Sequence, residues 1–319
     1  MSEYNELNVV VYHPSLANCY RELIEGGSSD GVSYFVCRQP DEIDRHIEEA
    51  DVLFTSVTFP REYLDRAHNL KWIQVMGAGV EKITLSGDLP DGVLVSRVTG
   101  TFGSRMAEYV LGHLLAVTQK IPLALHQQEA REWKPFTPGV LEGSVLGVAG
   151  AGSIGLEVAR KAAGLGLVVD VLDIHEPDHG AIRHAYCPQE RNEFLAGLDY
   201  LVITMPLTDD TRGFFDAAAF ASMKSSAWLL NMARGQLVDE GDLITALEKG
   251  DIAGAVLDVF CEEPLPADSP LWEMPNVRIT PHIAGPALPE EVMEVFWTNL
   301  RRFRDGETLI NAVDLKRQF

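Results

Sequence analysis

The hexapeptide Gly150-Ala151-Gly152-Ser153-Ile154-Gly155 follows an apolar run at residues 145–149 and opens a segment with helical spacing. In a dinucleotide-binding βαβ unit the first glycine permits a tight turn, the second lets the backbone approach a pyrophosphate, and the third lets helix and strand pack closely. The amides at the start of the helix, at Ser153 and Ile154, then face the phosphates. The pattern predicts a dinucleotide-binding turn; the alternative is a structural glycine turn in another α/β protein.

A second apolar run, residues 167–172, ends at Asp173, about 20 residues beyond the turn. At this place a carboxylate accepts hydrogen bonds from the hydroxyls of the adenosine ribose. A 2′-phosphate would instead meet Asp173 and Glu176, and the next basic side chain is Arg183. We therefore expect the protein to prefer NAD(H) over NADP(H), unless Asp173 only caps a strand.

The charge balance is strongly acidic, with 26 basic and 47 acidic residues and a net charge of −21. Such a surface repels nucleic acid and anionic membranes, so we expect neither as a partner. The acidity serves either solubility alone or adaptation to a salty cytoplasm.

The start of the chain and its cysteines bear on the cellular compartment. Residues 1–8 are polar and acidic, unlike a signal peptide, and no apolar run reaches membrane-spanning length. The four cysteines form no CxxC pair, which argues against a zinc site or a redox dithiol; they are Cys19, Cys37, Cys187 and Cys261. We expect a cytoplasmic protein with reduced thiols.

At 319 residues the chain exceeds the usual size of a protein with one hydrophobic core, so two domains are expected. Short β-rich runs alternate with helical stretches throughout, which predicts two doubly wound α/β domains with parallel sheets. The expected strands are 8–12, 32–37, 51–56, 71–76 and 93–98, then 145–150, 167–172, 200–204, 227–232, 254–259 and 277–280. The expected helices are 41–50, 61–68, 104–131 with a break near Pro122, 153–165, 189–198, 240–248 and 289–304.

The first domain is expected over residues 1–100 together with 286–319, because the last helix can return to it. This domain is therefore expected to be discontinuous and flavodoxin-like. Residues 101–285 are predicted to form the NAD-binding Rossmann domain.

Three polar side chains stand where strands of the second domain should end: Arg234, Glu263 and His282. Ligands of open α/β sheets bind beyond the carboxyl ends of the strands, so these side chains are expected to converge. Arginine offers a planar fork for a carboxylate, histidine exchanges protons near neutral pH, and glutamate orients the histidine. These groups suit the reduction of a 2-oxo acid with a nicotinamide, although each alone is also compatible with a structural role.

The same segments resemble the D-isomer-specific 2-hydroxyacid dehydrogenase family. The resemblance rests on the glycine turn, Pro206-Leu207-Thr208 with Thr211, Asn231-Met232-Ala233-Arg234-Gly235, Leu257 to Leu265 and Thr280 to Gly285. It implies two Rossmann-like domains with the active site in the interdomain cleft, and usually a homodimer. The first of these domains, formed by both ends of the chain, is implied to bind substrate. It further implies that Arg234 binds the substrate carboxylate and carbonyl, that Glu263 pairs with His282, and that His282 protonates the carbonyl oxygen. The cofactor contacts it implies are Thr204, Pro206, Thr211, Asn231, Ala233, Asp258, His282 and Gly285.

Two further segments resemble functional parts of the family. Gly77-Ala78-Gly79 resembles the loop whose amides hold the substrate carboxylate, with Glu81 where aspartate is more usual. Residues 104–140 resemble the dimerisation arm, and Trp133 resembles an arm tryptophan of the glyoxylate/hydroxypyruvate reductase branch that reaches the partner's pocket. The alternative for Trp133 is an ordinary interface aromatic.

The functional expectation is an NADH-dependent reductase that converts a small 2-oxo acid into a D-2-hydroxy acid. The alternative is an NAD(H)-sensing, corepressor-like protein on the same fold. Glu263 disfavours a formate dehydrogenase and Met76 a phosphonate dehydrogenase. No metal is expected: His175, His179 and His184 are interpreted as surface residues of a loop. The particular 2-oxo acid stays open.

Overall fold

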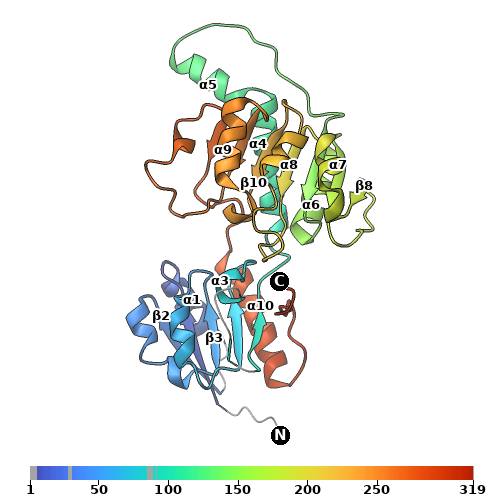
Figure 1. Cartoon of the computed structure of the whole chain (residues 1–319). Coiled ribbons are helices and arrows are strands. Elements are labelled where there is room, and N and C mark those ends of the chain that lie inside the picture. The colour runs from blue at the N-terminus through green and yellow to red at the C-terminus, as the bar shows by residue number, and fades with distance from the viewer. Residues whose placement is uncertain (1–5, 28–30, 85–88, 91, 319) are drawn as a thin grey trace. The chain divides into compact units, whose positions relative to one another are not determined.

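The computed structural model describes residues 6–27, 31–84, 89–90 and 92–318. Residues 1–5, which belong to the segment interpreted as unlike a signal peptide, lie outside the described residues. The chain divides into two compact units (Figure 1). Unit 1 comprises the described residues of 1–101 and 287–319, and unit 2 comprises residues 102–286.

Unit 1 contains a five-stranded parallel sheet in the order β2-β1-β3-β4-β5. The strands are β1 (Leu7–Tyr12), β2 (Val32–Cys37), β3 (Val52–Thr55), β4 (Trp72–Val75) and β5 (Leu94–Ser96). The α-helices are α1 (Ala17–Glu25), α2 (Pro40–Ile43), α3 (Glu81–Thr84) and α10 (Pro289–Arg304), with 3₁₀ turns η1 (Ile47–Glu49) and η2 (Arg61–Arg66). The strand order is the flavodoxin-like arrangement, in which ligands bind beyond the carboxyl ends of the strands.

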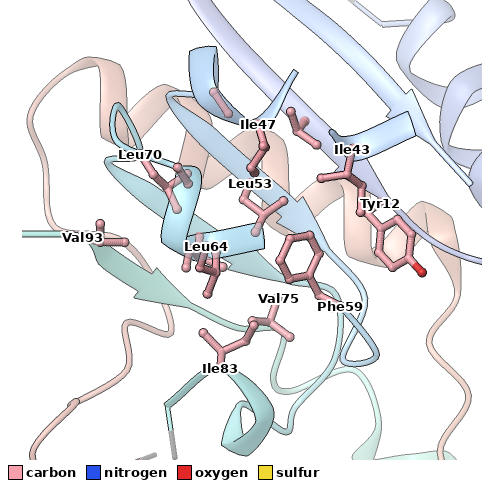
Figure 2. Close-up of a cluster of buried hydrophobic side chains, with 14 of the residues drawn as sticks. Tyr12, Ile43, Ile47, Leu53, Phe59, Leu64, Leu70, Val75, Ile83 and Val93 are labelled. Atoms are coloured by element: carbon pink, nitrogen blue, oxygen red, sulfur yellow. The ribbon is translucent and has the colours of Figure 1, made fainter. Parts of the chain in front are cut away.

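The sheet of unit 1 has an apolar layer on each face. On one face, Leu53 and Val75 pack with Ile43, Ile47 and Leu64 from the short helical turns (Figure 2). On the other face, Phe296 of α10 stacks on Trp72 and on Phe54, with ring centroids 5.5 and 4.2 Å apart. The last helix is therefore part of the core of unit 1.

Three helical segments of unit 1 differ from expectation. Residues 41–50 form α2 and the separate turn η1, and residues 61–66 form a 3₁₀ turn, in place of two α-helices. The elements α2, η1 and η2 each bury a single side chain, which is too little apolar surface to stabilise a longer helix; these side chains are Ile43, Ile47 and Leu64. Helix α1 was not expected from the sequence.

Unit 2 contains a seven-stranded parallel sheet in the order β12-β11-β10-β9-β6-β7-β8. The strands are β6 (Val145–Ala149), β7 (Val168–Leu172), β8 (Ile182–Tyr186), β9 (Tyr200–Ile203), β10 (Trp228–Asn231), β11 (Gly254–Leu257) and β12 (Val277–Ile279). The helices are α4 (Gly103–Thr118), α5 (Ile121–Glu129), α6 (Ser153–Gly164), α7 (Arg191–Ala196), α8 (Ala217–Ser222) and α9 (Glu240–Lys249), with 3₁₀ turns η3 (Pro188–Glu190), η4 (Gly235–Leu237) and η5 (Pro270–Trp272). The order reverses between β6 and β9, which is the dinucleotide-binding point of a doubly wound sheet.

Unit 2 corrects three predictions. Strand β8 was not expected, because its side chains are half-buried or exposed and carry no apolar alternation; His184 accordingly lies in a strand instead of a loop. The expected helix 104–131 is two helices, and the break lies at Lys120, whose φ is 55°, while Pro122 stands in the first turn of α5. Helix α8 was also missed.

Candidate functional site

The dinucleotide turn joins β6 to α6 at the centre of the sheet in unit 2. Gly150 has a φ of +100°, and a Cβ there would lie 2.6 Å from the amide nitrogen of Met205. A Cβ on Gly155 would lie 1.9 Å from the carbonyl oxygen of Gly150. Two of the three glycines are therefore required by the fold of the turn itself.

Gly152 differs from the other two because a Cβ there would meet no heavy atom within 4 Å. It stands at the N-cap of α6 with no side-chain hydrogen bond, beside the first helical amides at Ser153 and Ile154. Those amides have no acceptor within the helix. An open approach to free donors at a helix N-terminus fits the pyrophosphate of a dinucleotide.

Asp173, just after β7, braces the turn through its carboxylate. The amide of Ala151 donates to Oδ2 at 2.6 Å and the amide of His175 donates to Oδ1 at 3.1 Å. Arg183, the nearest following basic side chain, forms a two-pronged ion pair with the buried Asp170 of β7. The guanidinium of Arg183 is therefore engaged with a carboxylate of the sheet.

Residues expected along the cofactor also stabilise the loops after β9 and β10. The hydroxyl of Thr204 donates to the carbonyl of Gly150 at 2.7 Å, and that of Thr211 donates to the carbonyl of Pro206 at 2.7 Å. The buried amide of Asn231 donates to the carbonyl of Arg234 at 2.9 Å and accepts from the amide of Ala233 at 3.1 Å. These side chains shape the edge of the sheet.

Arg234 is the N-cap of η4, three residues after the end of β10. Its Nη1 donates to the carbonyl of Ala233 at 2.6 Å. A Cβ on the next residue, Gly235, would lie 2.0 Å from the carbonyl carbon of Phe260. This close contact brings the turn of Arg234 against the segment after β11 that contains Glu263.

Asp258 is 1% exposed and organises the turn after β12. Its Oδ1 accepts from the hydroxyl of Thr280 at 2.6 Å and from the amide of Ile283 at 2.8 Å, while Oδ2 accepts from the amide of Ala284 at 2.8 Å. The phenol of Tyr109, on α4, lies 2.7 Å from the hydroxyl of Thr280. Asp258 thus fixes the segment on both sides of His282.

His282 and Glu263 form an ion-pair geometry at this edge, with Nδ1 and Oε2 2.9 Å apart. The amide of Phe260 donates to Oε1 of Glu263 at 3.0 Å. Burial acts to raise the pKa of Glu263, but the hydrogen bonds from His282 and Phe260 and the charges of His282 and Arg234 outweigh it and lower that pKa. The structure therefore brings Arg234, Glu263 and His282 together around an ionised carboxylate.

Gly285 and Trp133 are placed differently from the other expected site residues. A Cβ on Gly285 would lie 2.8 Å from Cγ of Met106, so the packing of α4 explains this glycine. Trp133 follows α5 and is 96% exposed. Nothing in unit 2 covers its indole.

In unit 1, residues Gly77 to Val80 form a loop after β4. The carbonyls point into the fold: Gly77 accepts from the amide of Val98 at 3.1 Å, Ala78 from Nη1 of Arg97 at 3.0 Å, and Val80 from the amide of Ile83 at 2.9 Å. Within the described part of the chain, the amides of residues 77–80 have no acceptor. Such a row of free donors suits a carboxylate.

Sequence reasoning missed Tyr109, Thr280 and Arg97. Tyr109 was expected only as part of the helix 104–131 and of the segment that resembles the dimerisation arm, and Thr280 only as part of a motif. A hydrogen-bonding side chain on the buried face of a helix was the available signal for Tyr109. For Arg97 the signal was a basic residue inside the expected strand 93–98.

Among the residues with described positions, no group of three histidine, cysteine or carboxylate side chains is arranged to hold a metal ion. The helices in the described ranges include none long and apolar enough to cross a membrane.

Comparison with known proteins agrees with this architecture. Residues 111–284 match the model of the NAD-binding domain of D-isomer specific 2-hydroxyacid dehydrogenases. The chain is 35% identical to the glyoxylate/hydroxypyruvate reductase A of Photorhabdus laumondii over 263 residues, covering 81% of this chain and 84% of the relative.

Two solved structures are similar across almost the whole chain. A D-isomer specific 2-hydroxyacid dehydrogenase family protein from Aeromonas salmonicida superposes with a TM-score of 0.89 and 33% identity, covering 97% of this chain and all of that one. An NADPH-dependent glyoxylate/hydroxypyruvate reductase from Sinorhizobium meliloti, in complex with NADP and sulfate, gives 0.87 and 28%, covering 98% and 100%. The sheet orders, the glycine turn and these matches together show that the chain belongs to the D-isomer-specific 2-hydroxyacid dehydrogenase family.

Proposed function

We propose that this protein reduces a small 2-oxo acid to the D-2-hydroxy acid, with His282 as the proton donor. The observation that carries the proposal is the contact of 2.9 Å between Nδ1 of His282 and Oε2 of Glu263. A carboxylate at Nδ1 orients the ring and stabilises its protonated form. The other ring nitrogen, Nε2, is then the donor available to a substrate, and the side chain is 46% exposed.

The chain's own groups account for the binding and proton steps. A bound reduced nicotinamide supplies the hydride to the carbonyl carbon. Arg234 binds the carboxylate and carbonyl oxygen of the 2-oxo acid through its planar guanidinium. As the carbonyl bond opens, its oxygen takes the proton from Nε2 of His282, which leaves the imidazole neutral and yields the 2-hydroxy acid. Glu263 stays ionised throughout.

Unit 1 is proposed to bind substrate and unit 2 the dinucleotide. The free amides of Gly77, Ala78 and Gly79 are the groups of unit 1 that suit the substrate carboxylate. Glu81 follows this loop, where it opens α3. The open space at Gly152 and the helix amides after it suit the pyrophosphate.

We infer a preference for NAD(H), although three of the similar solved structures hold NADPH or NADP. The carboxylate of Asp173 stands after β7, where it would repel a 2′-phosphate. Arg183, the basic side chain that follows, is paired with Asp170. A 2′-phosphate would therefore meet an acid and no free guanidinium from this strand pair.

The substrate class follows from the relatives. Several similar proteins are named glyoxylate/hydroxypyruvate reductase A, so glyoxylate and hydroxypyruvate are the first candidates. The test measures steady-state turnover of a panel of 2-oxo acids with NADH and with NADPH. The absorbance of the reduced nicotinamide reports the rate. Turnover that vanishes in His282→Ala supports the proposal. Tight cofactor binding without turnover of any 2-oxo acid would instead favour the NAD(H)-sensing, corepressor-like alternative.

A homodimer built on the arm is part of the proposal. Helix α5 has no buried residue, and it extends with the following segment from the rest of unit 2 (Figure 1). Its apolar side chains are exposed: Ile121, Leu123 and Leu125, at 46, 40 and 55%. A second copy would cover them. Sedimentation of Leu125→Asp against the wild type tests this, and an unchanged dimer would exclude α5 from the interface.

The cysteines and the net charge support two further proposals, a cytoplasmic location and adaptation to salt. All four cysteines are free thiols, which suits the reducing cytoplasm. The net charge of −21 suits a salty cytoplasm, where carboxylates are screened. Activity and stability measured from low to molar salt test the second point, and an unchanged response would contradict it.

A further inference from the structure

Arg97 stands directly after β5, and its guanidinium contacts the loop of residues 77–80 in unit 1. Nη1 donates to the carbonyl of Ala78 at 3.0 Å. The backbone of Arg97 is fixed as well, because its amide donates to the carbonyl of Asn311 at 3.2 Å. The arginine is therefore held in place at the inner side of the loop.

Few groups near this guanidinium compensate its positive charge. Arg97 is half-buried, and among the described residues its guanidinium has one hydrogen bond, to a neutral carbonyl. Burial lowers the pKa of Arg97, and the carboxylate of Glu81 opposes this effect through its charge without a hydrogen bond to the guanidinium. A cation in this setting polarises the groups it touches more strongly than an exposed one.

The peptide between Ala78 and Gly79 connects the guanidinium to the open side of the loop. In a trans peptide the C=O and N–H groups point in opposite directions. An arginine that holds the carbonyl on the inner side therefore turns the amide of Gly79 outward. The cation on the oxygen also makes the N–H of the same peptide a stronger donor, as in any polarised hydrogen-bond chain.

We propose that Arg97 is a positioning residue for substrate binding, which orients and strengthens the Gly79 amide as a donor to the carboxylate of the 2-oxo acid. This inference rests on the proposed function, because it assigns the loop to the substrate. Arg97 acts through the peptide and does not touch the reacting atoms. It sets affinity for the carboxylate, while the proton transfer from His282 is independent of it.

The test compares Arg97→Gln and Arg97→Lys with the wild type, and Arg21→Gln is the matched control. Arg21, on α1, also donates to a backbone carbonyl in unit 1, that of Val36, but lies at an exposed position. In Arg97→Gln the KM for the 2-oxo acid and the inhibition constant of oxamate should rise together by roughly tenfold, equivalent to about 1.4 kcal/mol. The kcat and the dissociation constant of NADH should change less than about twofold.

Arg97→Lys retains a cation that can reach the carbonyl, so it should recover part of the lost affinity; Arg21→Gln should leave all constants unchanged. An unchanged KM in both Arg97 variants would overturn the proposal, and so would a loss of thermal stability with no change in KM. If Arg97→Gln does not fold, the KM of Arg97→Lys is the test. A raised KM in that variant supports the proposal, and an unchanged KM overturns it.

A wild-type protein that reduces no 2-oxo acid contradicts the proposed function and not the role of Arg97. In that case the variants are titrated with oxamate in the presence of NADH and followed by thermal shift. Equal oxamate affinity in the wild type and Arg97→Gln, including no binding to either, would overturn the inference separately.

Discussion

Nδ1 of His282 lies 2.9 Å from Oε2 of Glu263, and this contact depends on an unusual backbone. His282 has a φ of 54°, in the left-handed region that residues other than glycine seldom adopt. Its amide donates to the carbonyl of Asp258 at 2.9 Å, and the Asp258 carboxylate binds the next two amides. The strained position is stabilised by hydrogen bonds on both sides, as is typical of functional sites.

Replacement of His282 by alanine tests its role as proton donor. We expect kcat for reduction to fall by roughly 10²–10⁴-fold, because a positioned acid is lost. The affinity for the dinucleotide should change little, since the glycine turn is untouched. Stopped-flow turnover and NADH titration measure the two quantities. His68→Ala, at an exposed position of unit 1, is the control, and a His282→Ala variant with normal kcat would remove His282 from the mechanism.

Replacement of Glu263 by glutamine tests the ion pair through the pH profile. The pKa of Glu263 is lowered, so the carboxylate stays ionised across the neutral range. An amide stabilises a protonated imidazole less than a carboxylate does. The alkaline limb of kcat/KM for reduction should therefore move to lower pH by roughly one pH unit. An alkaline limb at the same pH in Glu263→Gln would contradict the pairing.

The same lowered pKa has a consequence for stability. A carboxyl whose pKa is lower in the folded state than in the unfolded state adds stability above the unfolded pKa and loses it as the pH falls through the folded pKa. The acid unfolding of the wild type should therefore include a contribution that is missing in Glu263→Gln. Thermal melts at neutral and acid pH for both proteins measure the difference.

Replacement of Tyr109 by phenylalanine tests whether its hydrogen bond to Thr280 stabilises the turn that contains His282. Since Thr280 donates its only hydroxyl proton to Asp258, the phenol of Tyr109 must donate to Thr280. Burial raises the pKa of Tyr109 to about 12, so the phenol keeps its proton. Tyr109→Phe should reduce stability by about 1 kcal/mol and lower kcat several-fold by loosening the turn. Tyr63→Phe is the control, and unchanged kcat in Tyr109→Phe would show that the turn needs no support from α4.

The fold class was predictable because the parallel sheets leave simple patterns. Strands β9 and β10, buried on both faces, appear as apolar runs, and α10 has the expected bounds because apolar side chains recur at helical spacing along one face. Strand β8 was not predictable, since its edge position leaves exposed side chains such as His184. The break at Lys120 depends on one backbone dihedral angle that no residue type in the segment requires.

The candidate site was predictable where a side chain closely follows a strand, as with Arg234 after β10 and His282 after β12. It was not predictable where contacts join distant parts of the chain. Tyr109 and Thr280 are 171 positions apart, and Arg97 acts on a carbonyl 19 positions away. Sequence spacing carries no information about such contacts until the register of the strands is known.

Asp173 tests the choice of cofactor. Asp173→Ser removes the carboxylate proposed to accept the ribose hydroxyls and to repel a 2′-phosphate. We expect the ratio of kcat/KM for NADH to that for NADPH to fall by at least about tenfold. Asp178→Ser, in the same loop but at an exposed position, is the control for the loss of one negative charge. A wild type that prefers NADPH would contradict the interpretation of Asp173.

Replacement of Asn299 by alanine tests how much the last helix stabilises unit 1 through buried hydrogen bonds. This side chain is fully buried on α10, where Nδ2 donates to Oε1 of Gln74 at 2.9 Å and to the carbonyl of Ile310 at 3.0 Å, and Oδ1 accepts from the amide of Ile310 at 2.8 Å. Asn299→Ala leaves the amide and the carbonyl of Ile310 without these hydrogen bonds, which costs about 1–3 kcal/mol for each unpaired group, whereas Oε1 of Gln74 keeps the hydrogen bond from the hydroxyl of Ser96. We expect a loss of about 3 kcal/mol in the free energy of unfolding, measured by denaturant titration. Asn69→Ala removes one exposed hydrogen bond, to the carbonyl of Glu48, and should cost far less; equal losses in the two variants would show that the buried network adds nothing.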